Sequence, residues 1–469
     1  MTSSLFLIQP SRSFGINGFR KYTIVLNFFN FLNFFNFRKN LPSQIPILRL
    51  ALPMIVTNIT VPLLGLIDVA IVGHIGDATY ISAIAVGSMI FNVIYWIFGF
   101  LHMGTSGLTS QALGRRDLTQ TTRQLARSTV VALCIAALIF IFQVPLKHLA
   151  FLVIHPDPEV IPLVSVYFNI CVWGAPAMLV LYSLSGWLVG MQNTRLPMLI
   201  SITQNVVNIL VSLMLVFGLG WRIEGVAAGT LIAQYAGLLM AVALIAWHYG
   251  RLRRYFASEG LLRWKEMSRF FRVNTDIFLR TLCLVAVNLY FLAAGSRQGA
   301  LILAANTLLM QLFMLYSYIM DGFAYAGEAL SGKYLGAGNR VALRKTIRHL
   351  FGWGLAVVVI FTCVYALWGP SFLTLLTDDT TVVNAATDYF LWAVAVPLAG
   401  MAAFIWDGIF IGTTYTRGML ISSAIAAAVF FIVYLLLRSV WGNHALWLAF
   451  ILFLLMRGIV QSVLVFFSK

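Results

Sequence analysis

Charged residues are scarce in this chain: they make up 10% of its 469 residues, and only 15 of them are Asp or Glu. An average soluble domain carries about a quarter charged residues, so this scarcity excludes a surface that is solvated by water on all sides. The chain also has only 4 Cys, which excludes a small disulfide-stapled scaffold. Apolar residues instead make up 61% of the sequence, a composition typical of an integral membrane protein.

The apolar residues gather in long runs separated by short connections. Because about 20 apolar residues cross a bilayer as a helix, the sequence predicts an all-α fold with twelve transmembrane helices. The predicted spans are residues 46–72, 79–104, 127–146, 161–187, 197–219, 224–248, 274–296, 300–326, 347–369, 385–411, 418–440 and 444–468. No connection is long enough to fold by itself, so we expect the function to reside in the helices.

The distribution of Lys and Arg predicts the orientation in the bilayer. Of the 31 basic residues, 25 fall on the side of the N-terminus, four fall on the other side, and Arg280 and Arg457 lie within predicted spans. Lys and Arg accumulate in cytoplasmic loops, so both termini are predicted to be cytoplasmic in a multi-pass protein of the inner (plasma) membrane. The net charge of +16 is therefore attributed to topology, with the lipid bilayer as a partner and no nucleic acid.

The chain is expected to divide into four parts. Residues 1–44 contain an Asn-rich apolar run that is too short to span, and we expect them to be disordered or to precede the true start, with an interfacial segment as the alternative. Residues 45–248 form a first half with six spans, and residues 274–469 form a second half with six more. Residues 249–273 are the cytoplasmic linker between them.

The two halves repeat each other at an offset of 222 residues. The clearest match sets Gly186, Gly190, Thr194 and Arg195 against Gly408, Gly412, Thr416 and Arg417. Because six is an even number, both halves enter the membrane in the same sense, which predicts two parallel six-helix repeats around a central cleft. This arrangement is typical of an alternating-access transporter and argues against a pore built from identical subunits.

Polar residues inside the first predicted span are the leading candidates for function, because such residues are costly in a bilayer. Asn58, Pro62 and Asp68 lie on one face of this helix, and Pro53 and Pro62 each remove a backbone donor, so the helix can bend. A carboxylate near the end of a bendable helix suits a protonation switch. The alternative is a structural Asp at the outer water boundary.

The fifth and sixth predicted spans supply companions for this carboxylate. Asn205, Asn208 and Ser212 share one face of the fifth span, and Thr230 lies among small residues in the sixth. An Asn amide both donates and accepts hydrogen bonds, so it can bind a carboxylate in either protonation state. The same side chains could instead join neighbouring helices, and the sequence leaves both interpretations open.

The second half carries charges at other positions. Asp276 and Arg280 are four residues apart and are expected to pair on one helix. Asp321 and Glu328 share a face at the end of the eighth span, and Asp407 lies in the tenth. The two halves are therefore predicted to share a scaffold and to serve different sites, with a proton in one and a cationic substrate in the other.

We predict that the chain is not an enzyme and needs no cofactor or metal. Its 7 His show no metal-ligand spacing, and the sequence lacks the phosphate-binding G-x4-G-K-[ST] segment of ATPases. Energy would then come from an ion gradient. Aromatic residues make up 14% of the chain and could line a cavity for flat organic cations, although most are expected to face lipid.

Several strings stand out in the two halves: Pro53 with Leu66–Gly76, Ser110–Gly114, Gln204–Asn208, Gly190–Pro197, Val273–Thr281 and Asp321–Gly332. They resemble the multidrug and toxic compound extrusion (MATE) family, and those of the second half resemble its DinF-like subfamily. The resemblance covers residues 46–468.

The resemblance implies a secondary antiporter that exports organic, often cationic, compounds in exchange for H+, with Na+ as the alternative. The coupling carboxylate of the family falls on Asp68, its asparagine on Asn208 and its threonine on Thr230. The carboxylate of sodium-coupled relatives falls on Asp407. One departure is Ser212, where many relatives carry a second acidic residue, so Asp68 would act alone or with Asn partners.

Two alternatives remain at the level of sequence. A flippase for lipid-linked saccharides would need a strongly cationic cavity, and the presence of only Arg280 and Arg457 within spans disfavours it. A non-transporting receptor is disfavoured by the short loops. The substrate and the choice between H+ and Na+ stay open, and a monomer is sufficient because the two halves are fused.

Overall fold

The computed structural model describes residues 37–73, 78–256 and 263–467. The side chains at several positions of the first helix, those of Pro62 and Asp68 among them, lie outside the described part. The contacts of the chain divide it into two units, residues 1–46 and residues 47–469.

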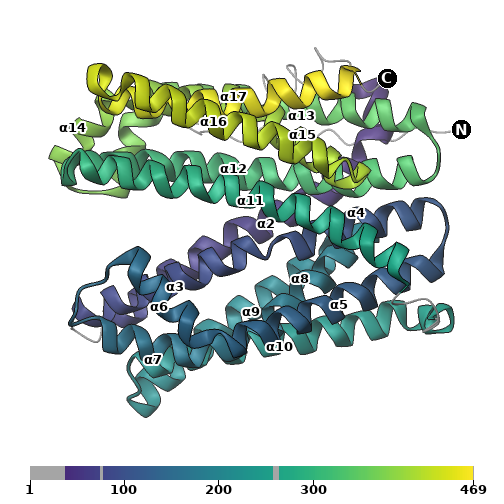
Figure 1. Cartoon of the computed structure of the whole chain (residues 1–469), viewed down its shortest axis with the longest axis horizontal. Coiled ribbons are helices and arrows are strands. Elements are labelled where there is room, and N and C mark those ends of the chain that lie inside the picture. The colour runs from purple at the N-terminus through teal and green to yellow at the C-terminus, as the bar shows by residue number, and fades with distance from the viewer. Residues whose placement is uncertain (1–36, 74–77, 257–262, 468–469) are drawn as a thin grey trace, which may run out of the picture. The chain divides into compact units, whose positions relative to one another are not determined.

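Every described element is a helix, and the described ranges contain no strand (Figure 1). The helices are α2 (Phe37–Gly73), α3 (Ala78–Ile97), α4 (Phe100–Gly114), α5 (Leu118–Ile141), α6 (Gln143–Ile154), α7 (Ile161–Cys171), η1 (Val172–Gly174), α8 (Ala175–Gly190), α9 (Arg195–Leu213), η2 (Met214–Gly218), α10 (Ile223–Tyr249), η3 (Gly250–Tyr255), α11 (Trp264–Arg297), α12 (Ala300–Gly336), α13 (Arg340–Leu376), α14 (Thr380–Asp388), α15 (Phe390–Thr413), α16 (Thr416–Trp441) and α17 (Asn443–Phe467).

Among the described residues, 11 helical segments are long and apolar enough to cross a membrane. They coincide with eleven of the predicted spans, so the expectation of an all-α membrane protein is confirmed. The remaining predicted span, residues 46–72, lies on α2, where the described side chains give the shorter apolar stretch Gln44–Thr60. The helix α11 begins at Trp264, inside the predicted linker 249–273, because its first turns contain good helix formers such as Lys, Glu and Met.

The backbone repeats with the same offset of 222 residues as the sequence. Left-handed backbone angles, which most residues avoid, occur at three pairs of positions with this spacing. The pairs are Arg116 and Gly338 (φ 60° and 68°), Gln192 and Thr414 (65° and 55°), and Gly220 and Gly442 (69° and 51°). Matching turns therefore end matching helices in the two halves.

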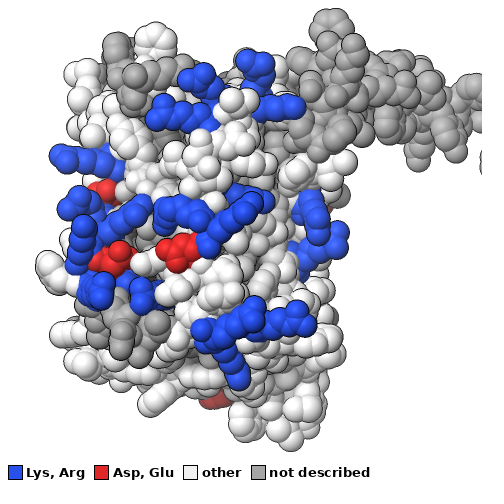
Figure 2. All heavy atoms as spheres, turned by 90° about the vertical axis from the view of Figure 1, so that its right-hand side faces the viewer, with Lys and Arg blue, Asp and Glu red and all other residues white. Residues whose placement is uncertain are grey.

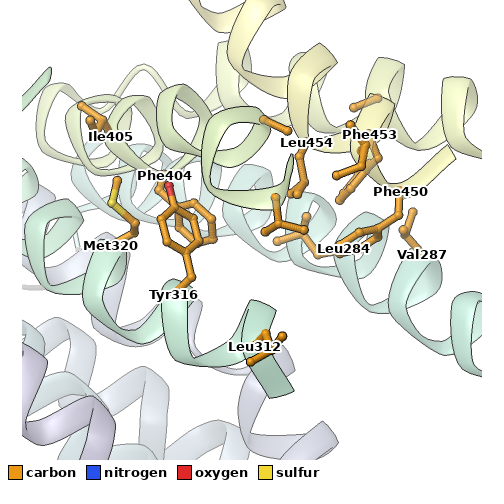
Figure 3. Close-up of a cluster of buried hydrophobic side chains, with 14 of the residues drawn as sticks. Leu284, Val287, Leu312, Tyr316, Met320, Phe404, Ile405, Phe450, Phe453 and Leu454 are labelled. Atoms are coloured by element: carbon orange, nitrogen blue, oxygen red, sulfur yellow. The ribbon is translucent and has the colours of Figure 1, made fainter. Parts of the chain in front are cut away.

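Buried apolar side chains form two clusters, one for each half of the chain. The first cluster is built mainly from α3 to α10 and the second mainly from α11 to α17. Figure 3 shows part of the second cluster, in which Tyr316 and Met320 of α12 lie near Phe404 and Ile405 of α15. Such packing stabilises each half as a unit.

The first helix of each half packs partly against the other half. Leu50 and Met54 of α2 belong to the second cluster, whereas Phe270 and Ile277 of α11 belong to the first. These two pairs occupy nearly equivalent places in the repeat. The exchange ties the halves together while leaving each with its own core.

Basic side chains gather on one face of the molecule. Figure 2 shows Lys and Arg clustered, with few acidic groups between them, on the side that lies to the right in Figure 1. The C-terminal ends of α4 and α12 and the start of α11 lie on that side (Figure 1). Basic residues at and beside these ends include Arg115, Arg116, Arg123, Arg263, Lys265, Arg272, Lys333, Arg340, Arg344, Lys345 and Arg348. We call it the cationic face.

Candidate functional site

The two halves meet where α4 and α8 of the first half pack against α12 and α15 of the second. Glycines permit this approach, because a Cβ at each would collide with the backbone of the other half. Gly107 faces the Ile411 carbonyl, Gly114 faces that of Lys333, and Gly336 faces that of Gln111. Small residues allow helices to come this close in membranes. We call this region the inter-half contact; it lies toward the cationic face.

Two glutamines donate hydrogen bonds across the inter-half contact. Gln111 Nε2 of α4 donates to the Gly412 carbonyl at 2.9 Å and to Thr414 Oγ1 at 3.1 Å. Gln192 Nε2, just after α8, donates to the Ala329 carbonyl of α12 at 2.7 Å. Sequence reasoning did not single out either residue. Their position beside the repeated Gly-rich strings could have indicated that they lie at a close contact between helices.

In the first half, Asn208, Thr230 and Ser212 lie together where α9 packs on α10. Asn208 Nδ2 donates to Thr230 Oγ1 at 3.0 Å. The Ser212 side chain lies against Gly229, the residue that precedes Thr230 in α10. Asn208 Oδ1 and Ser212 Oγ are buried and have no hydrogen-bond partner in the part of the chain that the structure describes. These two oxygens can therefore accept further hydrogen bonds, and the three side chains of the site carry no charge.

Asn58 and Asn205 instead anchor the backbone of two neighbouring helices. Asn205 Nδ2 of α9 donates to the Thr60 carbonyl of α2 at 3.2 Å. Asn58 Nδ2 of α2 donates to the Tyr318 carbonyl of α12, in the other half, at 3.0 Å. The helix α2 is therefore held to both halves by hydrogen bonds from neutral side-chain amides. Both amides belong to residues that the sequence marked as candidates.

Substitute donors surround Pro53 in α2. Pro53 has no N–H, so the carbonyl of Arg49 loses its helical partner, and Thr194 Oγ1 lies 3.4 Å from it. Thr57 Oγ1 in turn donates to the Pro53 carbonyl at 3.0 Å. Such compensation is what permits a proline inside a membrane helix. The side chains of Pro62 and Asp68 lie outside the described residues, so their predicted roles stay predictions.

In the second half, one carboxylate collects three donors from two helices. Arg280 of α11 and Arg457 of α17 both donate from Nη2 to Asp407 Oδ2 of α15, and Gln461 Nε2 donates to Oδ1 at 2.6 Å. All four side chains are buried. We call this group the Asp407 cluster.

The Asp407 cluster corrects one expectation from the sequence. Arg280 does not pair with Asp276: its ion-pair partner is Asp407, and Asp276 Oδ2 accepts a hydrogen bond from Thr416 Oγ1 at 2.8 Å. Spacing along one helix favoured the local pair, but a buried guanidinium binds the carboxylate that burial places against it. Gln461 and the participation of Arg457 were not anticipated, because both depend on how α17 packs.

Asp321 and Glu328 lie on α12 but in different surroundings. Asp321 lies within electrostatic range of Arg280, Arg457 and Asp407, and Ser317 Oγ donates to its Oδ2 at 3.4 Å. Glu328 is 2% exposed, lies against Ser106 of α4 and has an unpartnered Oε1 among the described residues. It belongs to the inter-half contact.

No group of three or more His, Cys, Asp or Glu that could hold a metal ion occurs in the described ranges. The polar site residues are amides, hydroxyls and a neutralised carboxylate. The amides and hydroxyls can bind a small polar ligand or a neighbouring carboxyl group between helices by hydrogen bonds.

The chain matches a known family twice over. The MatE family model matches residues 53–214 and again residues 277–437, one match in each half. The chain is 37% identical to the DNA damage-inducible protein F of Escherichia coli (strain K12) over 412 residues, which cover 87% of this chain and 89% of that protein. It is 19% identical to the multidrug export protein MepA of Staphylococcus aureus (strain NCTC 8325 / PS 47), over 84% of this chain and 86% of that one.

Solved structures share the fold. A MATE protein in the bent conformation aligns with a TM-score of 0.79 at 18% identity, covering 90% of this chain and 94% of its own. The outward-facing conformation of a multidrug resistance MATE family transporter of the MOP superfamily aligns equally well, with a TM-score of 0.79 at 18% identity, covering 90% and 95%.

Proposed function

Since the chain belongs to the MatE family and is an integral multi-pass membrane protein whose relatives are multidrug efflux transporters, we propose that it is a secondary antiporter. It exports organic, often cationic, compounds across the inner (plasma) membrane in exchange for H+. It works as a monomer, without a cofactor, because the two fused halves supply both sides of the substrate path.

The proposed topology has twelve spans in two parallel six-helix repeats, with both termini in the cytoplasm. The left-handed positions at a spacing of 222 residues support the repeat, as does the double match of the family model. The cationic face supports the orientation, because Lys and Arg accumulate on the cytoplasmic side. Residues 1–44 then precede the transport unit, and residues 249–273 join its halves.

The observation that carries the proposal is the inter-half contact. The matched halves keep separate cores and touch through α4, α8, α12 and α15 on the cationic side. Two rigid units in contact at one end can rock, so that the space between them opens alternately to either side. The structure then corresponds to a state that is closed toward the cytoplasm.

The coupling ion is H+, and Asp68 is the group that carries it. Both oxygens of Asp407 are engaged by Arg280, Arg457 and Gln461, which leaves no open carboxylate for Na+ at that site. Asn58, Asn205 and Asn208, with Ser212 and Thr230, form the neutral surroundings in which α2 moves. Protonation of Asp68 changes the bend of α2 at Pro53 and Pro62 and releases the substrate outward.

Transport in proteoliposomes tests this proposal. We expect an imposed pH gradient to drive efflux of a fluorescent organic cation, and Asp68→Asn to abolish it, because the variant has no proton to exchange. Asp157→Asn, an exposed carboxylate in the loop between α6 and α7, is the matched control and should transport normally. Full gradient-driven efflux by Asp68→Asn would disprove the role of Asp68. A Na+ gradient that drives transport instead would disprove H+ coupling.

A saccharide-lipid flippase is a weaker candidate. It would need free cations in the spans to hold a pyrophosphate, whereas Arg280 and Arg457 are bound to Asp407. A non-transporting receptor is weaker still, because the short loops offer little surface to a partner.

A further inference from the structure

Among the described residues of the inter-half contact, Glu328 is the acidic side chain, and it sits on the local symmetry axis of the repeat. Glu328 of α12 and Ser106 of α4 are 222 residues apart, so they occupy equivalent positions in the two halves. The Ser106 hydroxyl is near enough to act on the Glu328 carboxyl group where α4 and α12 pack together, and Ser106 Oγ has no hydrogen-bond partner among the described residues. A residue on such an axis meets its own counterpart, and here one half provides a hydroxyl and the other a carboxyl group.

Burial of this carboxyl group is nearly complete and is not compensated by a cation. Glu328 is 2% exposed and Ser106 is fully buried. None of the ion pairs among the described residues involves Glu328. Its Oε1 has no hydrogen-bond partner in the described part of the chain. A charged carboxylate is costly in such a place, whereas the protonated form is tolerated.

The surrounding titratable groups do not supply a counter-charge. On the helices that pack against this part of α12, and on α12 itself, they are His102 (α4), Tyr182 (α8), Arg269 and Arg280 (α11), Arg348 and His349 (α13), Asp407 (α15), Asp321, Tyr325 and Lys333. Arg269 Nη2 donates to Gln111 Oε1 at 3.1 Å. Tyr325 is a neutral phenol, and the His102 ring packs on it. Arg280 is bound to Asp407, and Arg348 is exposed.

We propose that Glu328 is a gate residue that must hold a proton before the two halves can close on the cationic side. When the contact opens, water reaches the carboxyl group, which releases the proton to the same side. When the contact closes, a proton from that side binds a carboxylate oxygen. The proton is taken from and returned to the cytoplasm, so it is not exchanged for substrate, unlike the proton on Asp68.

The consequence is a transporter that senses cytoplasmic pH. A more alkaline cytoplasm favours the ionised carboxylate, which is incompatible with the dry contact, so the closed state becomes less populated. This inference rests on the proposed alternating-access function, but its test needs neither substrate nor gradient.

The test measures the opening of the contact directly. Spin labels at Arg195→Cys and Arg417→Cys, exposed and equivalent positions at the starts of α9 and α16, report the distance between the halves by double electron–electron resonance. The background has Cys134, Cys171, Cys283 and Cys363 replaced by Ala. We expect the distance distribution to move to longer values as the pH is raised from about 6 to about 9, a range that lies above the pKa of about 4.3 of an exposed Glu.

Glu328→Gln should abolish this shift and keep the short distance at both pH values, because an amide cannot ionise. Glu328→Ser, which matches the residue at position 106, should behave in the same way. This second variant shows whether the result depends on the loss of the carboxyl group or on the amide that replaces it. Glu159→Gln, an exposed carboxylate, should keep the full shift. The proposal is overturned if the parent shows no shift, or if Glu328→Gln shifts as much as the parent.

This outcome is separable from that of the transport assay. If Asp68→Asn transports normally while Glu328→Gln removes the pH-dependent opening, the coupling proposal fails and the gate stands. If Asp68→Asn is inactive but Glu328→Gln still opens at high pH, the gate fails and the coupling proposal stands.

Discussion

The site around Asn208 in the first half rests on neutral hydrogen bonds, whereas the site around Asp407 in the second half rests on ion pairs. Asn208 donates to Thr230, and Asn205 donates to a backbone carbonyl of α2. In the second half, Asp407 binds Arg280 and Arg457. The backbone repeats between the halves, but the polarity of the sites does not.

This difference suits two mechanical roles. Neutral interhelical hydrogen bonds in membranes contribute about 0.6 kcal/mol on average, so they can be exchanged when a helix moves. A buried ion pair is costly to break, because one charge is left without a partner. We therefore expect the second half to behave as a rigid body against which α2 and the first half move.

The largest expected effect comes from breaking the Asp407 cluster. Asp407→Asn leaves two buried guanidinium groups without a carboxylate, which should destabilise the protein by about 3–5 kcal/mol. Thermal unfolding in detergent measures this loss, with the exposed Asp378→Asn as control. Replacing Asp407 by Leu together with Arg280→Met and Arg457→Met should restore most of the stability. Equal stability of Asp407→Asn and Asp378→Asn would remove the basis for a rigid second half.

A smaller effect is expected at the paired glycines of the inter-half contact. Gly114 and Gly336 are equivalent in the repeat, and a Cβ at either would meet backbone of the other half. Gly114→Val and Gly336→Val should each cost about 1–3 kcal/mol of overpacking in the closed state. The spin-label distance should move toward the open value in both variants. Gly352→Val is the matched control, because no atom lies within 4 Å of its Cβ position. Opening by only one of the two variants would show that the contact is not symmetric.

The smallest effect is expected at the neutral pair of the first half. A double-mutant cycle with Asn208→Ala and Thr230→Val should give a coupling free energy near 0.6 kcal/mol, because each partner can find other hydrogen bonds in the membrane. Thermal unfolding of the four proteins measures it. A coupling as large as the loss in Asp407→Asn would contradict the contrast between the halves.

Sequence reasoning located most of the candidate residues but not their partners. The structure places Asn208, Ser212 and Thr230 together, as their helical faces suggested, and it places Asn58 and Asn205 on backbone carbonyls instead. The expected local pair of Asp276 with Arg280 was wrong, since Arg280 binds a carboxylate 127 residues away. Helical spacing predicts which side chains share a face, but not which helix will cover that face.

The sequence by itself determined the membrane class, the helices, the repeat and the scarce polar positions, because these follow from apolar run length and from periodicity along one chain. Only the tertiary structure decided that Asp407 is neutralised by α11 and α17, and that Glu328 meets Ser106 at the inter-half contact. The physical reason is that the free energy of a buried charge depends on the groups packed against it. Those groups come from helices that are distant in the sequence.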